Sequence, residues 1–251
     1  MTGLTKPFSQ PNLSVLAVIE CLQWLAIQSR PISNIEMART MGVHRNRANR
    51  LLKSLVMAGI ASQGPDRKFS IGSGFHVLGA QSLYASGILR KTLPILESLH
   101  PLKSIVALGV LWKDQITYLY FHEPGLSVAQ GVGAHSAVPA TASSIGLALL
   151  AHHPEAVIDT FYRDRPIPDF ANLDELKIEL ARTRERGFGR HAHRGIAEHL
   201  SEAIGIRFRG TLTYAVALGE WPANQKESVR RQALQQAARD IEAALADPAL
   251  P

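Results

Sequence analysis

Residues 33–55, SNIEMARTMGVHRNRANRLLKSL, predict two short helices joined by a tight turn. Ser33 and Glu36 have the spacing of a capping box, in which the two side chains satisfy amide groups at the start of a helix. Gly42 supplies the backbone conformation that ends a helix, and a second helix is expected to begin near His44. This order is the pattern of a helix-turn-helix.

The second of these helices has an apolar face and an opposite polar face. Arg and Asn side chains can bond to base edges in a DNA groove, and Lys or Arg can neutralise phosphate. We therefore predict that this helix contacts DNA through six residues: Arg45, Asn46, Arg47, Asn49, Arg50 and Lys53. The alternative is an ordinary amphipathic helix whose basic face is only solvated.

The residues after this helix predict the wing of a winged helix. Two short strands, 60–63 and 67–71, flank a Gly-Pro-Asp turn at 64–66, and this composition favours a hairpin. Arg67 and Lys68 follow the turn directly, where they are expected to reach the phosphates or the minor groove of DNA. The alternative is an exposed hairpin whose charges serve solubility.

Positive charge is concentrated in the first third of the 251-residue chain. The formal net charge is +6, and residues 1–75 contain nine Lys and Arg against three Asp and Glu. Basic and acidic residues are balanced in the remainder of the chain. This distribution is typical of a nucleic-acid-binding module joined to a neutral domain, and it does not fit a uniformly basic architectural protein.

The sequence lacks the patterns of a secreted or membrane protein. Cys21 is the only cysteine, which argues against a disulfide framework or a thiolate metal cluster. Residues 1–12 lack the apolar core of a signal peptide, and no stretch approaches the length of a membrane span. We therefore expect a cytoplasmic protein with no membrane partner.

Catalytic and metal-binding patterns are weak. The sequence has no G-x-S-x-G elbow, no H-E-x-x-H and no phosphate-binding P-loop. His191 and His193 have a spacing that would place them on one face of a strand, but no cysteine or carboxylate at a recognisable spacing completes a zinc site. We expect neither an enzyme nor a metal or other cofactor.

The chain is predicted to form two domains joined by a helix. Strands alternate with helices after residue 93, which is typical of an α+β domain. The helix that begins at Leu13 is apolar on more than one side, so we expect it to be buried both in its own domain and against a second copy of the chain. The predicted segments are a flexible tail (1–12), a winged helix-turn-helix domain (13–75), a connecting helix (76–92) and a C-terminal domain (93–251).

The order of these motifs resembles that of the IclR family of bacterial transcriptional regulators. The first domain contributes the capped helix, the glycine turn, the helix that ends in RLLKSL (50–55) and a wing that ends in FSIG (69–72). The later motifs that carry the resemblance are VLG (77–79), PILESL (94–99), TASSIGLALLA (141–151) and RERGF (184–188). The resemblance covers the chain from residue 13 onward.

The resemblance implies a GAF-like effector-binding domain, with an antiparallel sheet flanked by helices and a pocket for a small organic acid. Hydroxyl groups, the amides at a helix start and a protonatable imidazole can together hold a carboxylate. By position in the family, the implied effector-binding residues are Ser143, Ser144, Ile145, His191 and Ser201. The alternative is that the serines cap helices and the histidines are exposed.

Two departures from the family bear on the ligand. A basic run at 190–194 stands where the family often has an acidic pair, and Ala217 and Gly219 stand where it often has serines. These differences predict a pocket with one cationic wall. We expect an anionic ligand with an apolar body, such as an aromatic or phenolic acid.

Together, the basic helix and the resemblance predict a ligand-responsive transcriptional regulator, either repressor or activator. It would bind double-stranded operator DNA as a homodimer, alone or as a dimer of dimers, because a single winged helix makes few base contacts. The alternative is a small-molecule-binding enzyme or sensor with a vestigial DNA-binding head.

Overall fold

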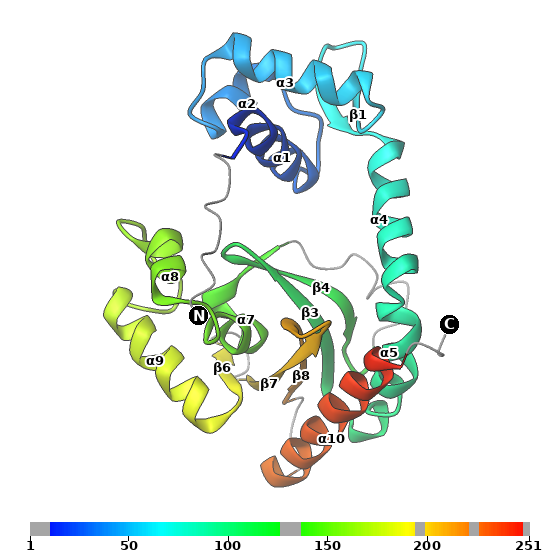
Figure 1. Ribbon diagram of the computed structural model, residues 1–251, viewed down its shortest axis with the longest axis vertical. Coiled ribbons are helices and arrows are strands. Elements are labelled where there is room, and N and C mark those ends of the chain that lie inside the picture. The colour runs from blue at the N-terminus through cyan, green and yellow to red at the C-terminus, as the bar shows by residue number, and fades with distance from the viewer. Residues whose placement is uncertain (1–10, 126–136, 194–198, 221–225, 248–251) are drawn as a thin grey trace, which may run out of the picture. The chain divides into compact units, whose positions relative to one another are not determined.

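The computed structural model describes residues 11–125, 137–193, 199–220 and 226–247 (Figure 1). The chain divides into two compact units, Met1–Ala85 and Ser86–Pro251. Most of the predicted tail, 1–12, lies outside the described residues. Asn12 is described, and its side chain caps the first helix by accepting hydrogen bonds from the amides of Ser14 and Val15.

The core of the first unit is formed by three helices and an antiparallel hairpin. Its largest fully buried side chains are Leu25, Met37, Leu52 and Phe69, which come from all three helices and the hairpin. This is the architecture predicted from the sequence. Its elements are α1 (Leu13–Ala26), α2 (Asn34–Thr40), α3 (Arg45–Met57), β1 (Ala61–Gln63) and β2 (Phe69–Ile71).

The connecting segment differs from the single helix expected over 76–92. It contains two helices, α4 (Ser73–Ser86) and α5 (Ile88–Glu97), separated by Gly87. Gly87 has a left-handed φ of 65°, a conformation that interrupts the hydrogen bonds of an α-helix. Ile88 and Leu96 bury α5 in the core of the second unit. The apolar pattern continues across this glycine, which is why it did not predict the break.

The second unit is organised around a six-stranded antiparallel sheet with the strand order β5-β4-β3-β8-β7-β6. The predicted α+β class and antiparallel sheet are therefore confirmed. Its strands are β3 (Ile105–Trp112), β4 (Gln115–His122), β5 (Val138–Pro139), β6 (Gly189–His193), β7 (His199–Phe208) and β8 (Thr211–Gly219).

Helices cover both faces of this sheet (Figure 1). One face carries α7 (Ser144–Leu150), α8 (Glu155–Tyr162) and α9 (Leu173–Arg186), and the other carries α5 and α10 (Glu227–Ala246). The described part of the unit also contains two short 3-10 helices, η1 (His100–Leu102) and η2 (Ala140–Ala142). The last helix begins at Glu227, after Lys226 as its N-cap. The spacing of Asn224 and Glu227 predicts a capped helix start at Asn224, a residue that lies outside the described residues.

The two faces of the sheet differ in side-chain size. Large residues such as Leu108, Val216 and Leu218 contact α5 and α10. Alanines lie on the face that contacts α7, and those in its core are Ala107, Ala203, Ala215 and Ala217. Because alanine leaves room above the sheet, α7 can approach the strands closely.

Two glycines mark where α7 comes closest to its neighbours. A Cβ atom on Gly189 of β6 would lie 2.1 Å from the carbonyl oxygen of Ser144, and one on Gly146 would lie 1.9 Å from that of Ala140. Neither position can hold a side chain without movement of the backbone. The start of α7 is therefore fixed from two sides.

None of the described helices combines the length and the apolar character needed to cross a membrane.

We predict that Gly146→Ala destabilises the chain by about 3 kcal/mol, because the added methyl group must displace backbone in a close-packed core. Gly79→Ala is the control, since a Cβ atom on Gly79 of α4 would meet no neighbouring atom within 4 Å. There, alanine should leave stability unchanged or raise it by about 0.5–1 kcal/mol. Urea unfolding followed by circular dichroism measures both, and equal midpoints would contradict the close approach.

Candidate nucleic-acid interface and ligand pocket

The start of α3 is fixed by a side-chain cap. His44 is the N-cap residue, and its Nδ1 accepts a hydrogen bond from the amide of Asn46 at 3.3 Å. The apolar stripe of the helix is anchored by Ala48, Leu52 and Leu55, which are all buried. This anchoring leaves the opposite, basic face of α3 at the surface.

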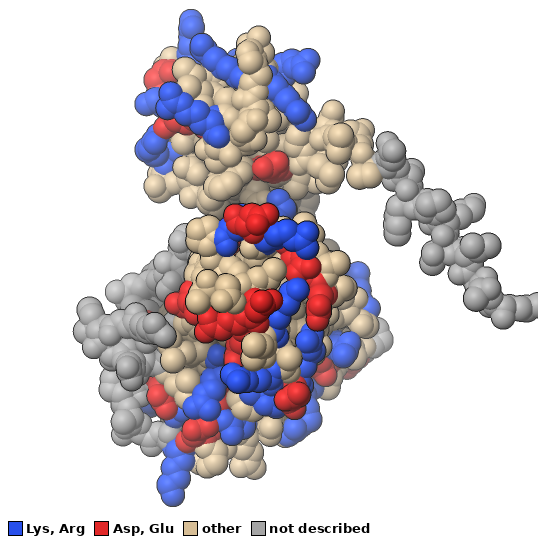
Figure 2. Space-filling model, turned by 90° about the vertical axis from the view of Figure 1, so that its left-hand side faces the viewer, with Lys and Arg blue, Asp and Glu red and all other residues tan. Residues whose placement is uncertain are grey.

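Most of the predicted DNA-contacting residues of α3 are exposed. On the face of the first unit that Figure 2 displays, Lys and Arg side chains outnumber acidic side chains. Asn49 differs, because it is half-buried and its Oδ1 accepts a hydrogen bond from Asn34 Nδ2 of α2 at 3.3 Å. The exposed residues of the face are Arg45, Asn46, Arg47, Arg50 and Lys53.

The wing ends in a hydrogen-bonded turn that places both predicted wing residues at the surface. The Gly64 amide donates to the Lys68 carbonyl at 2.9 Å, and the Arg67 amide donates to the Gly64 carbonyl at 3.0 Å. Arg67 and Lys68 are exposed, and Lys68 Nζ lies 3.4 Å from an Asp66 carboxylate oxygen. Part of the Lys68 charge is therefore balanced locally.

The predicted capping box at the start of α2 is present. Glu36 accepts a hydrogen bond from the Ser33 amide at 2.8 Å, and Ser33 Oγ accepts one from the Glu36 amide at 3.2 Å. Arg30 adds an ion pair to Glu36 at 2.7 Å. The hydrogen bond from the Ser33 backbone, followed by that from Arg30, lowers the pKa of Glu36 from its ordinary 4.5 to about 2.

The second unit contains a pocket of about 380 Å³ between the sheet and the start of α7. Four of the five predicted effector residues line it: Ser143, Ser144, Ile145 and Ser201. Ala217 and Gly219, the two departures from the family pattern, also line it. The small residues at these two positions enlarge the pocket instead of adding hydroxyl groups.

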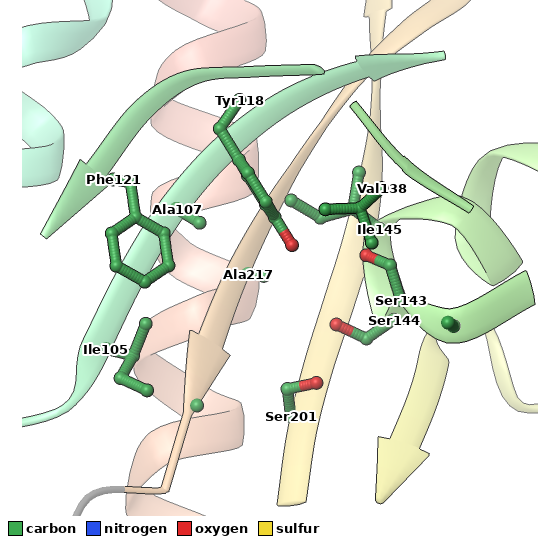
Figure 3. A pocket seen from close by; sticks show the side chains of 12 residues that line it. Ile105, Ala107, Tyr118, Phe121, Val138, Ser143, Ser144, Ile145, Ser201 and Ala217 are labelled. Carbon is green, nitrogen blue, oxygen red and sulfur yellow. The ribbon is translucent and has the colours of Figure 1, made fainter. Parts of the chain in front are cut away.

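The pocket has a polar side and an apolar side (Figure 3). The hydroxyl groups of Tyr118, Ser143, Ser144 and Ser201 face the same space, opposite apolar residues that include Phe121. Burial raises the pKa of Tyr118, and a hydrogen bond with Ser143 offsets part of that increase. The phenol therefore stays neutral near pH 7 and can donate a hydrogen bond.

His191 lies outside this pocket, so the cationic wall predicted from the sequence is not found among its described lining residues. The His191 side chain is 9% exposed, and its Nε2 lies 2.9 Å from Asp169 Oδ2. With Arg190 it lines a separate hollow near the end of α9. The side chains of His193 and Arg194 lie outside the described residues.

Comparisons with known proteins identify the fold. No protein-family model matches the sequence, and no curated protein matches it significantly. Solved structures do match over nearly the whole chain. An IclR homologue from Microbacterium hydrocarbonoxydans, crystallised with 4-hydroxybenzoate, is 22% identical with a TM-score of 0.64, and the match covers 92% of this chain and 98% of that one.

Two further crystal structures superpose with a higher TM-score of 0.76. An IclR transcriptional regulator from Silicibacter sp. TM1040 is 18% identical, with coverage of 94% of this chain and 98% of that one. An IclR family regulator from Brucella abortus is 20% identical, with coverage of 97% and 96%. This chain has the IclR fold.

Within the IclR fold, β3 and β4 contribute four pocket residues that are not among those predicted from the sequence. These are Ile105, Ala107, Tyr118 and Phe121. A signal for β3 existed, because Ile105 and Ala107 alternate with the larger residues of the opposite face. No comparable signal existed for Tyr118 and Phe121, which are three residues apart on one strand and yet line the same pocket.

Within the described part of this IclR fold, no group of three or more His, Cys, Asp or Glu side chains is arranged to hold a metal ion. His152 and His153 follow one another at the end of α7, and burial lowers the pKa of His153, with His152 adding to the effect.

We predict that Glu36→Gln lowers the free energy of unfolding near neutral pH, because the amide loses the ionic part of its contacts with Ser33 and Arg30. Because the pKa of Glu36 is lowered, its charge adds to the free energy of unfolding at pH values above 4.5, its ordinary pKa. This added stability is lost as the pH falls toward about 2. The difference between the wild type and Glu36→Gln should therefore shrink across that interval. Urea unfolding at several pH values measures it, and a difference independent of pH would show that the charge of Glu36 is not involved.

Proposed function

We propose that this chain is a member of the IclR family and acts as a ligand-responsive transcriptional regulator. The observation that carries the proposal is the exposed basic face of α3, which the capped helix and the buried stripe of Leu52 and Leu55 hold at the surface. A separate pocket in the second unit supplies a place for an effector.

Several features support DNA binding by the first unit. Arg45, Arg47 and Arg50 can contact base edges or phosphates when α3 enters a major groove. Lys68 and Arg67, at the wing, are suited to the phosphate backbone. The excess of positive charge over residues 1–75 would draw the unit toward any duplex and add a salt-dependent term to its affinity.

The pocket favours a small ligand with an apolar ring and one polar end. Its lining residues among those described are apolar or carry hydroxyl groups, with no charged side chain. A carboxylate or phenol would thus be held by hydrogen bonds from Tyr118 and the serines, without an ion pair. The complex of the Microbacterium hydrocarbonoxydans homologue with 4-hydroxybenzoate supports an aromatic acid as the effector class.

We also propose that the chain binds DNA as a homo-oligomer. Leu13, Val15, Leu16 and Ile19 of α1 are exposed, and the sequence predicts that one side of this apolar helix packs against a second copy of the chain. A second copy of the chain would cover them, and two winged helices would then read the two halves of a palindromic operator.

Fluorescence anisotropy tests the DNA-binding proposal. The full chain is titrated into a labelled fragment from the region upstream of its own gene and into a scrambled fragment of equal length, at moderate salt. Tighter binding to the upstream fragment supports the proposal, and addition of 4-hydroxybenzoate should change that affinity if the pocket is regulatory. Equal binding to both fragments would contradict operator recognition at this site.

We predict that Arg50→Ala weakens binding to the operator by about 1–3 kcal/mol and weakens binding to the scrambled fragment much less, because Arg50 lies at the centre of the exposed face of α3. Lys68→Ala should weaken binding to both fragments alike and lower the slope of log affinity against log salt by about one. Anisotropy titrations over a range of salt measure both variants. Equal losses on every fragment for both would show that α3 does not read bases.

We predict that Tyr118→Phe raises the Kd for 4-hydroxybenzoate about tenfold, because it removes one buried hydrogen bond. Tyr120→Phe is the matched control, since Tyr120 is on the same strand but its hydroxyl contacts His100 Nε2 at 2.5 Å and does not line the pocket. Isothermal titration calorimetry of the full chain measures both. The pocket assignment would be wrong if the two variants lost affinity equally, and the effector class would be wrong if the wild type bound no aromatic acid.

A further inference from the structure

A single side chain, Gln63, connects α3 to the tip of the wing. Its Oε1 accepts a hydrogen bond from Lys53 Nζ of α3 at 2.6 Å. Its Nε2 donates a hydrogen bond to the backbone carbonyl of Arg67 at 3.0 Å. Gln63 is the last residue of β1, so the side chain spans from the hairpin to the helix on one side and to the turn on the other.

The chemistry of the two partners fixes the orientation of the Gln63 amide. A lysine ammonium can only donate hydrogen bonds, and a backbone carbonyl can only accept them. Rotating the amide by 180° would place Nε2 against Lys53 and Oε1 against the Arg67 carbonyl, which would break both contacts. Both ends of the amide are therefore needed in this arrangement.

Arg67 occupies a position in the turn at which a side chain is disfavoured. The turn has Pro65 and Asp66 at its centre, and Arg67 follows with a left-handed φ of 63°. Hairpins of this kind usually place glycine or asparagine at such a position. Here the carbonyl of this arginine accepts the hydrogen bond from Gln63, in addition to the backbone hydrogen bonds of the turn itself.

We propose that Gln63 is a positioning residue that holds the Arg67 side chain for contact with the same duplex that α3 enters. The proposal rests on the proposed DNA-binding function of the first unit. Lys53 keeps two of its three donors for phosphate while it bonds to Gln63. Gln63 thus links α3 to the turn of the wing. This link would fix the position of Arg67 relative to Lys53 when both contact the duplex.

A purely structural role for Gln63 would be stabilisation of the hairpin. The hairpin offers a matched contact for comparison, because Ser62 and Ser70 bond to each other through their hydroxyl groups at 2.9 Å. Ser62 is adjacent to Gln63 on β1, and its hydroxyl bond joins the two strands only. Ser62→Ala therefore removes a wing hydrogen bond without breaking the link between α3 and Arg67.

A double-mutant cycle tests the positioning role in DNA binding. The full chain selects a duplex of about 30 base pairs from a random pool, and anisotropy gives the Kd of Arg67→Ala in three backgrounds: wild type, Gln63→Met and Ser62→Ala. We expect Arg67→Ala to raise the Kd about fivefold in the wild type and in Ser62→Ala, but less than about twofold in Gln63→Met. An equal effect of Arg67→Ala in all three backgrounds would overturn the proposal.

Trypsin cleavage between Arg67 and Lys68 supplies a measurement that needs no DNA. Gln63→Met should speed the appearance of the fragment that begins at Lys68 by about tenfold over the wild type and over Ser62→Ala, because cleavage requires the turn to open. Equal cleavage rates in all three proteins would overturn the positioning role even if DNA binding is confirmed. Failure of the wild type to select any duplex would instead overturn the proposed function, and faster cleavage of Gln63→Met would still support the contact between Gln63 and Arg67.

Discussion

The second unit depends on the small side chains that one face of its sheet presents. Along β8 the residues alternate in size, so that Val216 and Leu218 contact α10 while Ala215 and Ala217 face α7. Alanine on that face lets α7 lie close to the sheet. The approach is so close that position 189 of β6 has no room for a side chain, and glycine stands there. The same small side chains also line the pocket beside the start of α7, where Ala107 and Ala217 lie opposite Ser144 and Ile145. Close packing and the cavity beside it therefore have one cause.

The residues that line the pocket could be predicted from the sequence only in part. The serines at 143 and 144 came from their position in the family motif, TASSIGLALLA at 141–151, and the spacing of the residues alone did not single them out. Tyr118 and Phe121 could not be found, because strict alternation puts residues three apart on opposite faces. The pairing of β3 with β4 shifts by one residue near Gly109, which returns both aromatic side chains to the same face. His191 was also taken from its position in the family, and it lies outside the pocket because it pairs with Asp169, a residue 22 positions earlier with a left-handed φ of 65°.

The first unit was predicted more fully, because the signals that define it act over a few residues. The capping box at Ser33 and the stripe of Leu52 and Leu55 need no information from elsewhere in the chain. Asn49 shows the limit of this reasoning. Helical periodicity places it on the basic face, yet Asn34 of α2 bonds to its side chain and half-buries it. Which side chains of an amphipathic helix remain available thus depends on the neighbouring helix as well as on the period.

The two proposed activities use different physical interactions, and this difference constrains how they can be coupled. Contacts of Arg50 and Lys68 with a duplex would release counterions, so salt would weaken them. The described lining of the pocket carries hydroxyl groups and apolar surface, whose interactions with a ligand depend little on salt. The described lining includes none of the basic residues of α3, so a ligand held there does not occupy their phosphate contacts. It can change occupancy of DNA only by binding more tightly to one of two states that differ in DNA affinity. Salt would then set the affinity of the DNA-binding state, and the ligand would set how much of that state is present.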